Sequence, residues 1–163
     1  MSRNRELIAI LRGLTRERCV MVGEILIAEG FSKLEIPLNS PNPMETISKM
    51  QNRFGNSVII GAGTVTNVSE VNELYNLGCQ MIVSPNTDTA VINATKNKGM
   101  LSFPGAFTPS ECFSAINSDA DGLKIFPAFK LGVKGFKALK AVLPSNLKLM
   151  PLVESMKRIS VIG

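Results

Sequence analysis

The sequence predicts a parallel α/β fold, either an open doubly wound sheet or a (β/α)8 barrel, and the ends of the expected strands favour the barrel. Short apolar runs alternate with helical segments about every 20 to 30 residues, which is typical of βα units on a parallel sheet. In a barrel the carboxyl ends of the strands meet at one mouth, whereas in an open sheet they spread along an edge. Polar residues stand at or near several such ends, namely Arg12, Glu35, Asn39, Thr64, Asn86 and Lys124.

Each expected strand is a short apolar run that a glycine, a proline or a polar residue closes. The first run, Leu-Ile-Ala-Ile-Leu, has no polar residue, as expected for a strand covered on both faces. Pro37 interrupts the second strand, and Gly61-Ala62-Gly63-Thr64 follows the third. The expected strands span residues 7–11, 33–38, 58–60, 80–83, 100–103, 122–126 and 147–153.

Capping residues and glycines set the expected helix boundaries. Thr15, Asn67 or Ser69, and Thr108 are suitable N-caps, and Glu111 gives Thr108 the spacing of a capping box. Gly30, Gly78 and Gly99 are suitable C-terminal stops. The expected helices span residues 16–29, 44–54, 67 or 69 to 77, 88–98 and 133–142, and another begins at Thr108.

The composition is that of a globular protein with one domain. The 163 residues are 45% hydrophobic and 19% charged, which excludes a disordered chain. No apolar run approaches the roughly 18 residues of a membrane helix, and the run at 7–11 is too short for a signal peptide. The three cysteines, Cys19, Cys79 and Cys112, lack metal-ligand spacing, so a reduced, cytoplasmic compartment is expected.

Charge and residue usage narrow the range of possible partners and catalytic mechanisms. The net charge of +5 is spread along the chain, and one tyrosine with no tryptophan leaves little to stack on bases, so no nucleic-acid or membrane partner is expected. A phosphorylated small molecule would use the same positive field. The chain has no histidine, which excludes Ser-His-Asp catalysis and removes the commonest general base.

Lys124 is the first candidate for catalysis because it lies inside an apolar strand. Alternation puts Leu123 and Ile125 on one face and Lys124 and Phe126 on the other. An amine in an apolar interior loses its proton more readily, and a neutral amine attacks carbonyl carbon. The alternative is an edge-strand lysine that prevents aggregation.

Glu35, Arg12 and the segment 61–64 are the other candidates. Glu35 is a carboxylate inside an apolar strand, suited to proton transfer or to a buried ion pair with Lys124 or Arg12. Arg12 would bind a carboxylate or simply be solvated, and Gly61-Ala62-Gly63-Thr64 offers amides and a hydroxyl or forms a tight turn. Together they predict Schiff-base aldolase chemistry on a 2-keto acid, with no metal or cofactor.

These residues make the chain resemble the 2-keto-3-deoxy-6-phosphogalactonate and 2-keto-3-deoxy-6-phosphogluconate aldolases. The similarity runs in family order from residue 7 to about 152 and implies a TIM barrel of the aldolase type. Pro37-Leu38-Asn39-Ser40-Pro41 is similar to the phosphogalactonate branch, because the phosphogluconate branch usually has arginine where Asn39 stands. The matching segments are 8–13, 35–41, 60–65, 82–86, 104–105, 123–127 and 137–144.

The resemblance also implies roles, a substrate and an assembly. Lys124 would form the Schiff base, and Glu35 would be the acid and base, acting through a water. Cleavage of 2-keto-3-deoxy-6-phosphogalactonate would give pyruvate and D-glyceraldehyde 3-phosphate. Family members are typically cytoplasmic homotrimers without metal. The substrate-binding residues would be Arg12, Thr64, Pro85 and Phe126.

The resemblance ends near Leu152. Residues 1–152 are therefore expected to form one barrel domain, and residues 153–163 to be a divergent tail. A frameshift near Val153 is one explanation for the tail. The glycine turns that usually bind the phosphate are not recognisable there. With about seven strands and the closing strand missing, the first and seventh strands would present unpaired edges. A poorly soluble or partly folded chain is therefore expected. The alternative function is a non-catalytic remnant that at most binds pyruvate or intact subunits.

Overall fold

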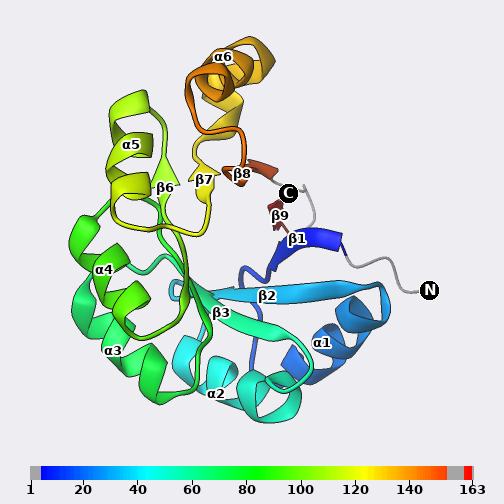
Figure 1. Ribbon diagram of the computed structural model, residues 1–163. Helices are drawn as coiled ribbons and strands as arrows, with labels where there is room; N and C mark the ends of the chain where they lie inside the picture. Colours follow the sequence, from blue (N-terminus) through cyan, green and yellow to red (C-terminus); the bar gives the residue numbers. More distant parts are fainter. Residues whose placement is uncertain (1–4, 154–159, 163) are drawn as a thin grey trace.

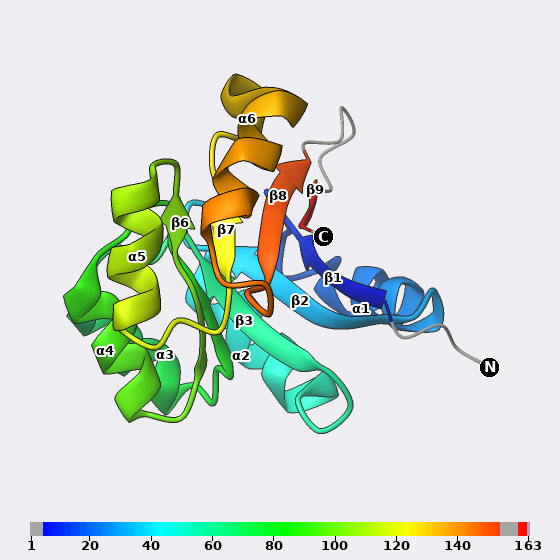
Figure 2. The same ribbon diagram turned by 45° about the horizontal axis from the view of Figure 1, so that its top comes forward.

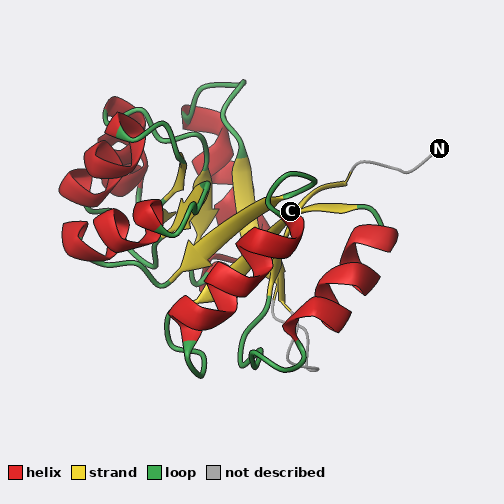
Figure 3. Cartoon of the chain, turned by 90° about the horizontal axis from the view of Figure 1, so that it is seen from below, coloured by secondary structure: helices red, strands yellow, loops and turns green. Residues whose placement is uncertain are grey.

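The computed structural model of the protein describes residues 5–153 and 160–162 and shows helices arranged around a central set of strands (Figures 1 and 3). The predicted alternation of strands and helices is confirmed. The strands are β1 (Arg5–Ile10), β2 (Phe31–Pro37), β3 (Ile59–Gly63), β4 (Met81–Val83), β5 (Leu101–Phe103), β6 (Gly105–Ala106), β7 (Leu123–Ile125), β8 (Leu149–Val153) and β9 (Ser160–Ile162). The helices are α1 (Cys19–Ala28), α2 (Pro43–Phe54), α3 (Val68–Asn76), α4 (Thr89–Asn97), α5 (Pro109–Asn117) and α6 (Ala128–Val142).

Most helix boundaries follow the predicted caps. Asn67 accepts a hydrogen bond from the Glu70 amide at 2.9 Å, and Thr108 and Glu111 form the expected capping box. Thr15 is not an N-cap, because α1 begins only at Cys19, after a turn over the preceding residues. Helix α6 begins earlier than predicted, at Ala128, and contains a break at Gly132.

The strands follow the order β5-β4-β3-β2-β1-β9-β8-β7-β6 in a nine-stranded sheet. All pairs from β1 to β5 and from β6 to β8 are parallel, as predicted for a sheet of βα units. The two ends of this order, β5 and β6, are separated in the chain by Pro104 alone. The sheet therefore curves round on itself, and the predicted (β/α)8 type of barrel is confirmed over these parallel strands.

The predicted unpaired edges at the first and last parallel strands are wrong. Strand β9 lies between β1 and β8 and pairs with both, in antiparallel orientation (Figures 1 and 2). Val161 is opposite Ala9 on one side and Val153 on the other. The divergent tail thus supplies backbone pairing in the place where a parallel barrel has its eighth strand, although the tail segment 154–159 lies outside the described residues. One reason for expecting a partly folded chain, the unpaired edges, is thereby removed.

Apolar side chains form a lumen inside the strands and two layers outside them. The lumen is filled by residues such as Ile10, Met81 and Met150. One outer layer packs β1 to β4 against their helices, and the other packs β6 to β8 against α5 and α6. Among the described residues, no helix combines the length and apolarity needed to cross a membrane.

A proline in β9 tests whether this strand holds the barrel together. Val161→Pro removes an amide from a strand that is paired on both sides, where proline is normally excluded. Each backbone hydrogen bond contributes about 0.5–1.5 kcal/mol, so the thermal unfolding midpoint should fall by roughly 1–6 °C. Circular dichroism on Val161→Pro and on the control Val161→Ala provides the comparison. Equal midpoints in the two variants would show that β9 does not support the sheet.

Candidate active site

Lys124 lies in β7 with its side chain in the lumen, and it is only 7% exposed. Its neighbours Leu123 and Ile125 belong to the outer layer, whereas Phe126 packs against the lumen cluster, so the predicted alternation is confirmed. The Nζ atom of Lys124 is 4.8 Å from the centre of the Phe126 ring. The edge-strand alternative is wrong, because β7 pairs with β6 and with β8.

Three polar contacts fix the start of β7, and with it the lysine. The Asp121 carboxylate accepts hydrogen bonds from Lys96 Nζ at 2.7 Å and from the Ser102 amide at 2.8 Å through the same oxygen. The Lys124 amide donates to the carbonyl of Pro104 at 2.9 Å. Helix α4, strand β5 and the entry to β7 are thus joined immediately before the lysine.

Glu35 lies in β2 and is 2% exposed, with its carboxylate in the same lumen. Burial raises the pKa of Glu35 to about 7, while the positive charges of Lys124 and Arg12 oppose this rise. Among the described residues, none provides a hydrogen bond to Oε2 of this carboxylate. A carboxylate with a pKa near neutrality can both accept and donate a proton, which suits an acid and base catalyst.

Arg12 lies on the exposed loop after β1, where its charge acts on Glu35. One hydrogen bond attaches the loop to β2, and a second attaches it to the segment after β2. The Leu11 amide donates to the Glu35 carbonyl at 2.8 Å, and the Gly13 amide donates to Ser40 Oγ at 3.1 Å. Ser40 was not among the predicted site residues, and its only signal in the sequence was its position as a small polar residue in the segment 35–41.

Thr64 directly follows β3 and has a φ of +61°. A β-branched residue rarely adopts this left-handed conformation, which costs about 1–2 kcal/mol for an L-residue. The alternative that residues 61–64 form only a tight turn is wrong, because Gly61 and Gly63 are paired strand residues of β3. Thr64 is therefore held at the strand end in a strained conformation.

Phe126 lies beside the lysine, and Pro85 lies beside Gly105, the strand residue that pairs with the lysine. Gly105 pairs with Lys124 and lies so close to the Pro85 carbonyl that a Cβ atom at position 105 would overlap it. Phe126 follows β7 directly, with its ring near the lysine amine. The predicted site residues therefore come from the ends of β1, β2, β3, β4 and β7, which meet at one opening of the barrel.

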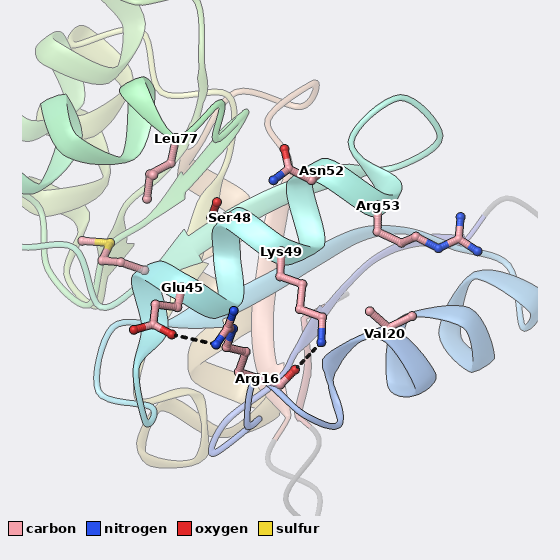
Figure 4. A pocket seen from close by; sticks show the side chains of 9 residues that line it. Arg16, Val20, Glu45, Ser48, Lys49, Asn52, Arg53 and Leu77 are labelled. Atoms are coloured by element: carbon pink, nitrogen blue, oxygen red, sulfur yellow. Dashed lines mark hydrogen bonds and ion pairs between the residues drawn. The ribbon is translucent and has the colours of Figure 1, made fainter.

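A pocket outside the barrel is lined by residues in and near α1 and α2 and by Leu77, and it does not gather comparable chemistry (Figure 4). Its cations are already matched: Arg16 pairs with Glu45 at 3.5 Å, and Lys49 donates to the Arg16 carbonyl at 3.0 Å. Arg53, which also lines it, pairs with Glu24 at 3.1 Å. Within the part of the chain that the structure describes, no three cysteine or acidic side chains are placed to hold a metal ion.

Comparison with known proteins identifies the family. Residues 1–153 match the family described as KDPG and KHG aldolase. The chain belongs to this aldolase family. Aldolases are lyases, so the chain is a member of a lyase family. The family resemblance seen in the sequence is confirmed.

Individual relatives support the same assignment. The probable 2-dehydro-3-deoxy-6-phosphogalactonate aldolase of Rhizobium meliloti (strain 1021) is 46% identical over 145 residues, covering 89% of this chain and 68% of the relative. The 2-dehydro-3-deoxy-6-phosphogalactonate aldolase of Escherichia coli (strain K12) is 43% identical over 141 residues, covering 86% and 69%. A solved structure described as native KDPGal superposes with a TM-score of 0.86 at 41% identity, covering 91% of this chain and 73% of that one.

The buried carboxylate predicts how stability depends on pH. The pKa of Glu35 in the folded protein, about 7, lies above its ordinary value of 4.5, so the folded protein retains a proton that the unfolded chain releases between these values. This contribution to stability is fully present below about pH 4.5 and is lost as the pH rises through about 7. Relative to Glu35→Gln, the free energy of unfolding should fall by on the order of 2–4 kcal/mol from pH 4.5 to pH 8. Urea denaturation at both pH values measures it, and parallel pH profiles for the two proteins would contradict it.

The conformation of Thr64 predicts an unusual effect of glycine. Thr64→Gly and Thr64→Ala both remove the hydroxyl, but only glycine relieves the positive φ. Thr64→Gly should therefore have a free energy of unfolding about 1 kcal/mol larger than that of Thr64→Ala. Chemical denaturation of the pair measures the difference, and greater stability of the alanine variant would show that the strain is absent.

Proposed function

We propose that the protein is a class I aldolase that cleaves 2-keto-3-deoxy-6-phosphogalactonate to pyruvate and D-glyceraldehyde 3-phosphate. The observation that carries this proposal is a lysine in an apolar barrel lumen that also holds a buried carboxylate. The relatives from Rhizobium meliloti and Escherichia coli, both named for the phosphogalactonate substrate, support the choice of sugar acid. Asn39, which lies exposed after β2, is the residue typical of that branch.

Lys124 begins the reaction as the nucleophile. Its neutral amine attacks the C2 carbonyl carbon of the substrate, giving a carbinolamine that loses water to become an iminium. Glu35 donates the proton that lets the hydroxyl leave as water. The apolar lumen excludes bulk water from this adduct and strengthens the electrostatic contacts around it.

The iminium then accepts the electron pair of the broken carbon–carbon bond. Removal of the C4 hydroxyl proton by the Glu35 carboxylate lets the C3–C4 bond break, which releases the aldehyde and leaves an enamine on Lys124. Return of a proton from Glu35 to C3 gives the pyruvate iminium, and water hydrolyses this to pyruvate and the free lysine. The near-neutral pKa of Glu35 suits both directions of proton transfer.

The remaining residues bind and orient the substrate in this proposal. Arg12 binds the carboxylate through its guanidinium, and Thr64 binds it through the hydroxyl that the strand end holds in place. Pro85 and Phe126 form the walls beside the lysine.

The proposed biological context follows the family. The protein acts as a homotrimer in the cytoplasm, and three buried cysteines that form no disulfide support a reducing compartment. Residues 1–152 form the aldolase domain, and the tail from residue 153 adds β9 to its sheet.

Borohydride trapping with pyruvate tests the nucleophile. The wild-type protein should be labelled at Lys124 alone, and Lys124→Met should take no label, because reduction fixes only the iminium. The exposed lysine Lys137 on α6 supplies the control variant Lys137→Met, which should be labelled like the wild type. Peptide mass spectrometry locates the label.

Cleavage of 2-keto-3-deoxy-6-phosphogalactonate, coupled to detection of pyruvate, tests the enzyme. Glu35→Gln should lower turnover by about 10²–10⁴-fold, the usual contribution of general acid–base catalysis. Label at another lysine would refute the assignment. Label at Lys124 without cleavage would instead support the pyruvate-binding remnant.

A further inference from the structure

Gly63 lies in β3 directly against the Glu35 carboxylate. A Cβ atom added at Gly63 would overlap Glu35 Oε1, and it would also lie 3.2 Å from Glu35 Cγ. The three nearest atoms to such a Cβ all belong to the Glu35 side chain. The carboxylate therefore occupies the space that any other residue at position 63 would fill.

The backbone at Gly63 gives no other reason for a glycine. Gly63 is not among the described glycines with positive φ, and it pairs in regular parallel register with Pro37 of β2 and Val83 of β4. Glycine in a strand interior weakens the strand, and it often marks a close approach by another group. Here the approaching group is the Glu35 carboxylate.

Apolar side chains disfavour movement of the Glu35 carboxylate deeper into the lumen. The same lumen is filled by apolar side chains, among them Ile8, Ile10 and Met81, which are at most 2% exposed. A carboxylate forced away from position 63 therefore moves toward the solvent at the mouth. Because Oε2 has no hydrogen-bond donor among the described residues, the move would break no hydrogen bond to that oxygen.

We propose that Gly63 is the positioning residue for Glu35. Because glycine has no side chain, it leaves the space in which the Glu35 carboxylate is held inside the lumen, at the depth of Lys124. The proposal rests on the proposed function only where it gives Glu35 its role in proton transfer. Gly63 itself touches no reacting atom, so it is not a catalytic residue.

Gly61 provides a matched control, because it lies two residues earlier on the same face of β3. A Cβ atom at Gly61 would meet Met81, at 2.6 Å from its Cε and 2.8 Å from its backbone oxygen. The obstacle at Gly61 thus includes rigid backbone, whereas the obstacle at Gly63 is the end of a flexible side chain. Gly61→Ala should destabilise the fold, and Gly63→Ala should displace one carboxylate and leave the fold intact.

Carboxyl ¹³C NMR of protein labelled at glutamate tests the displacement without any need for activity. The Glu35 signal, identified by its loss in Glu35→Gln, should titrate near pH 7 in the wild type. In Gly63→Ala its midpoint should fall by about one unit or more as the group becomes hydrated, whereas in Gly61→Ala it should stay. An unchanged Glu35 midpoint in folded Gly63→Ala, or an equal fall in Gly61→Ala, would overturn the proposal.

A second pair of variants covers the case in which Gly63→Ala does not fold. In a Glu35→Ala background there is no carboxylate to displace, so adding Gly63→Ala should leave the thermal unfolding midpoint unchanged. An equal drop of the midpoint in both backgrounds would mean that Gly63 has another structural role, and the proposal would fail.

Activity provides the last readout and separates this proposal from the proposed function. Gly63→Ala should lower turnover by about 10²-fold, the effect of a misplacement of roughly 1 Å. If the wild-type protein cleaves no sugar acid, the proposed function fails, while the titration and stability measurements still decide the role of Gly63.

Discussion

Two ionisable side chains, Lys124 and Glu35, share one apolar lumen, and the rest of the structure serves to keep them there. Removing a carboxylate from water is unfavourable, and the raised pKa of Glu35 measures that penalty after the nearby positive charges have reduced it. The lumen side chains exclude water, the outer layers hold the strands against their helices, and the Asp121 contacts fix the entry to β7. The same burial brings the pKa of the Glu35 carboxyl to about 7.

The walls of the lumen depend on backbone pairing more than on side chains. Strand β9 shows this most directly, because it runs against the direction of β1 and β8 and still pairs with both. Hydrogen bonding between strands requires only amides and carbonyls in register, so a strand of either direction satisfies the neighbouring edges. A barrel edge that would otherwise be available for aggregation is covered in this way.

The sequence predicted those features that short-range chemistry determines. Alternation along β7 was enough to separate Lys124 from Leu123 and Ile125, and the spacing of Thr108 and Glu111 was enough to predict a capping box. Local patterns say nothing about partners far along the chain. Gly63 was therefore noticed only as a member of the segment 61–64, and its contact with Glu35 was not predicted. The pairing of β9 was missed for the same reason, since it brings residues near 161 beside residues near 9.

The position of Pro104 between β5 and β6 has a geometric consequence for the site. Between Pro104 and β9, the ring of strands consists of two arcs, one from β1 to β5 and one from β6 to β8. Glu35 lies on the first arc, whereas Lys124 lies on the second. The separation of Glu35 and Lys124 is therefore set by the two junctions between the arcs, a single proline on one side and a three-residue strand on the other. The relative position of these two side chains therefore depends on the whole ring of strands, including the pairing of β9 with β1 and β8.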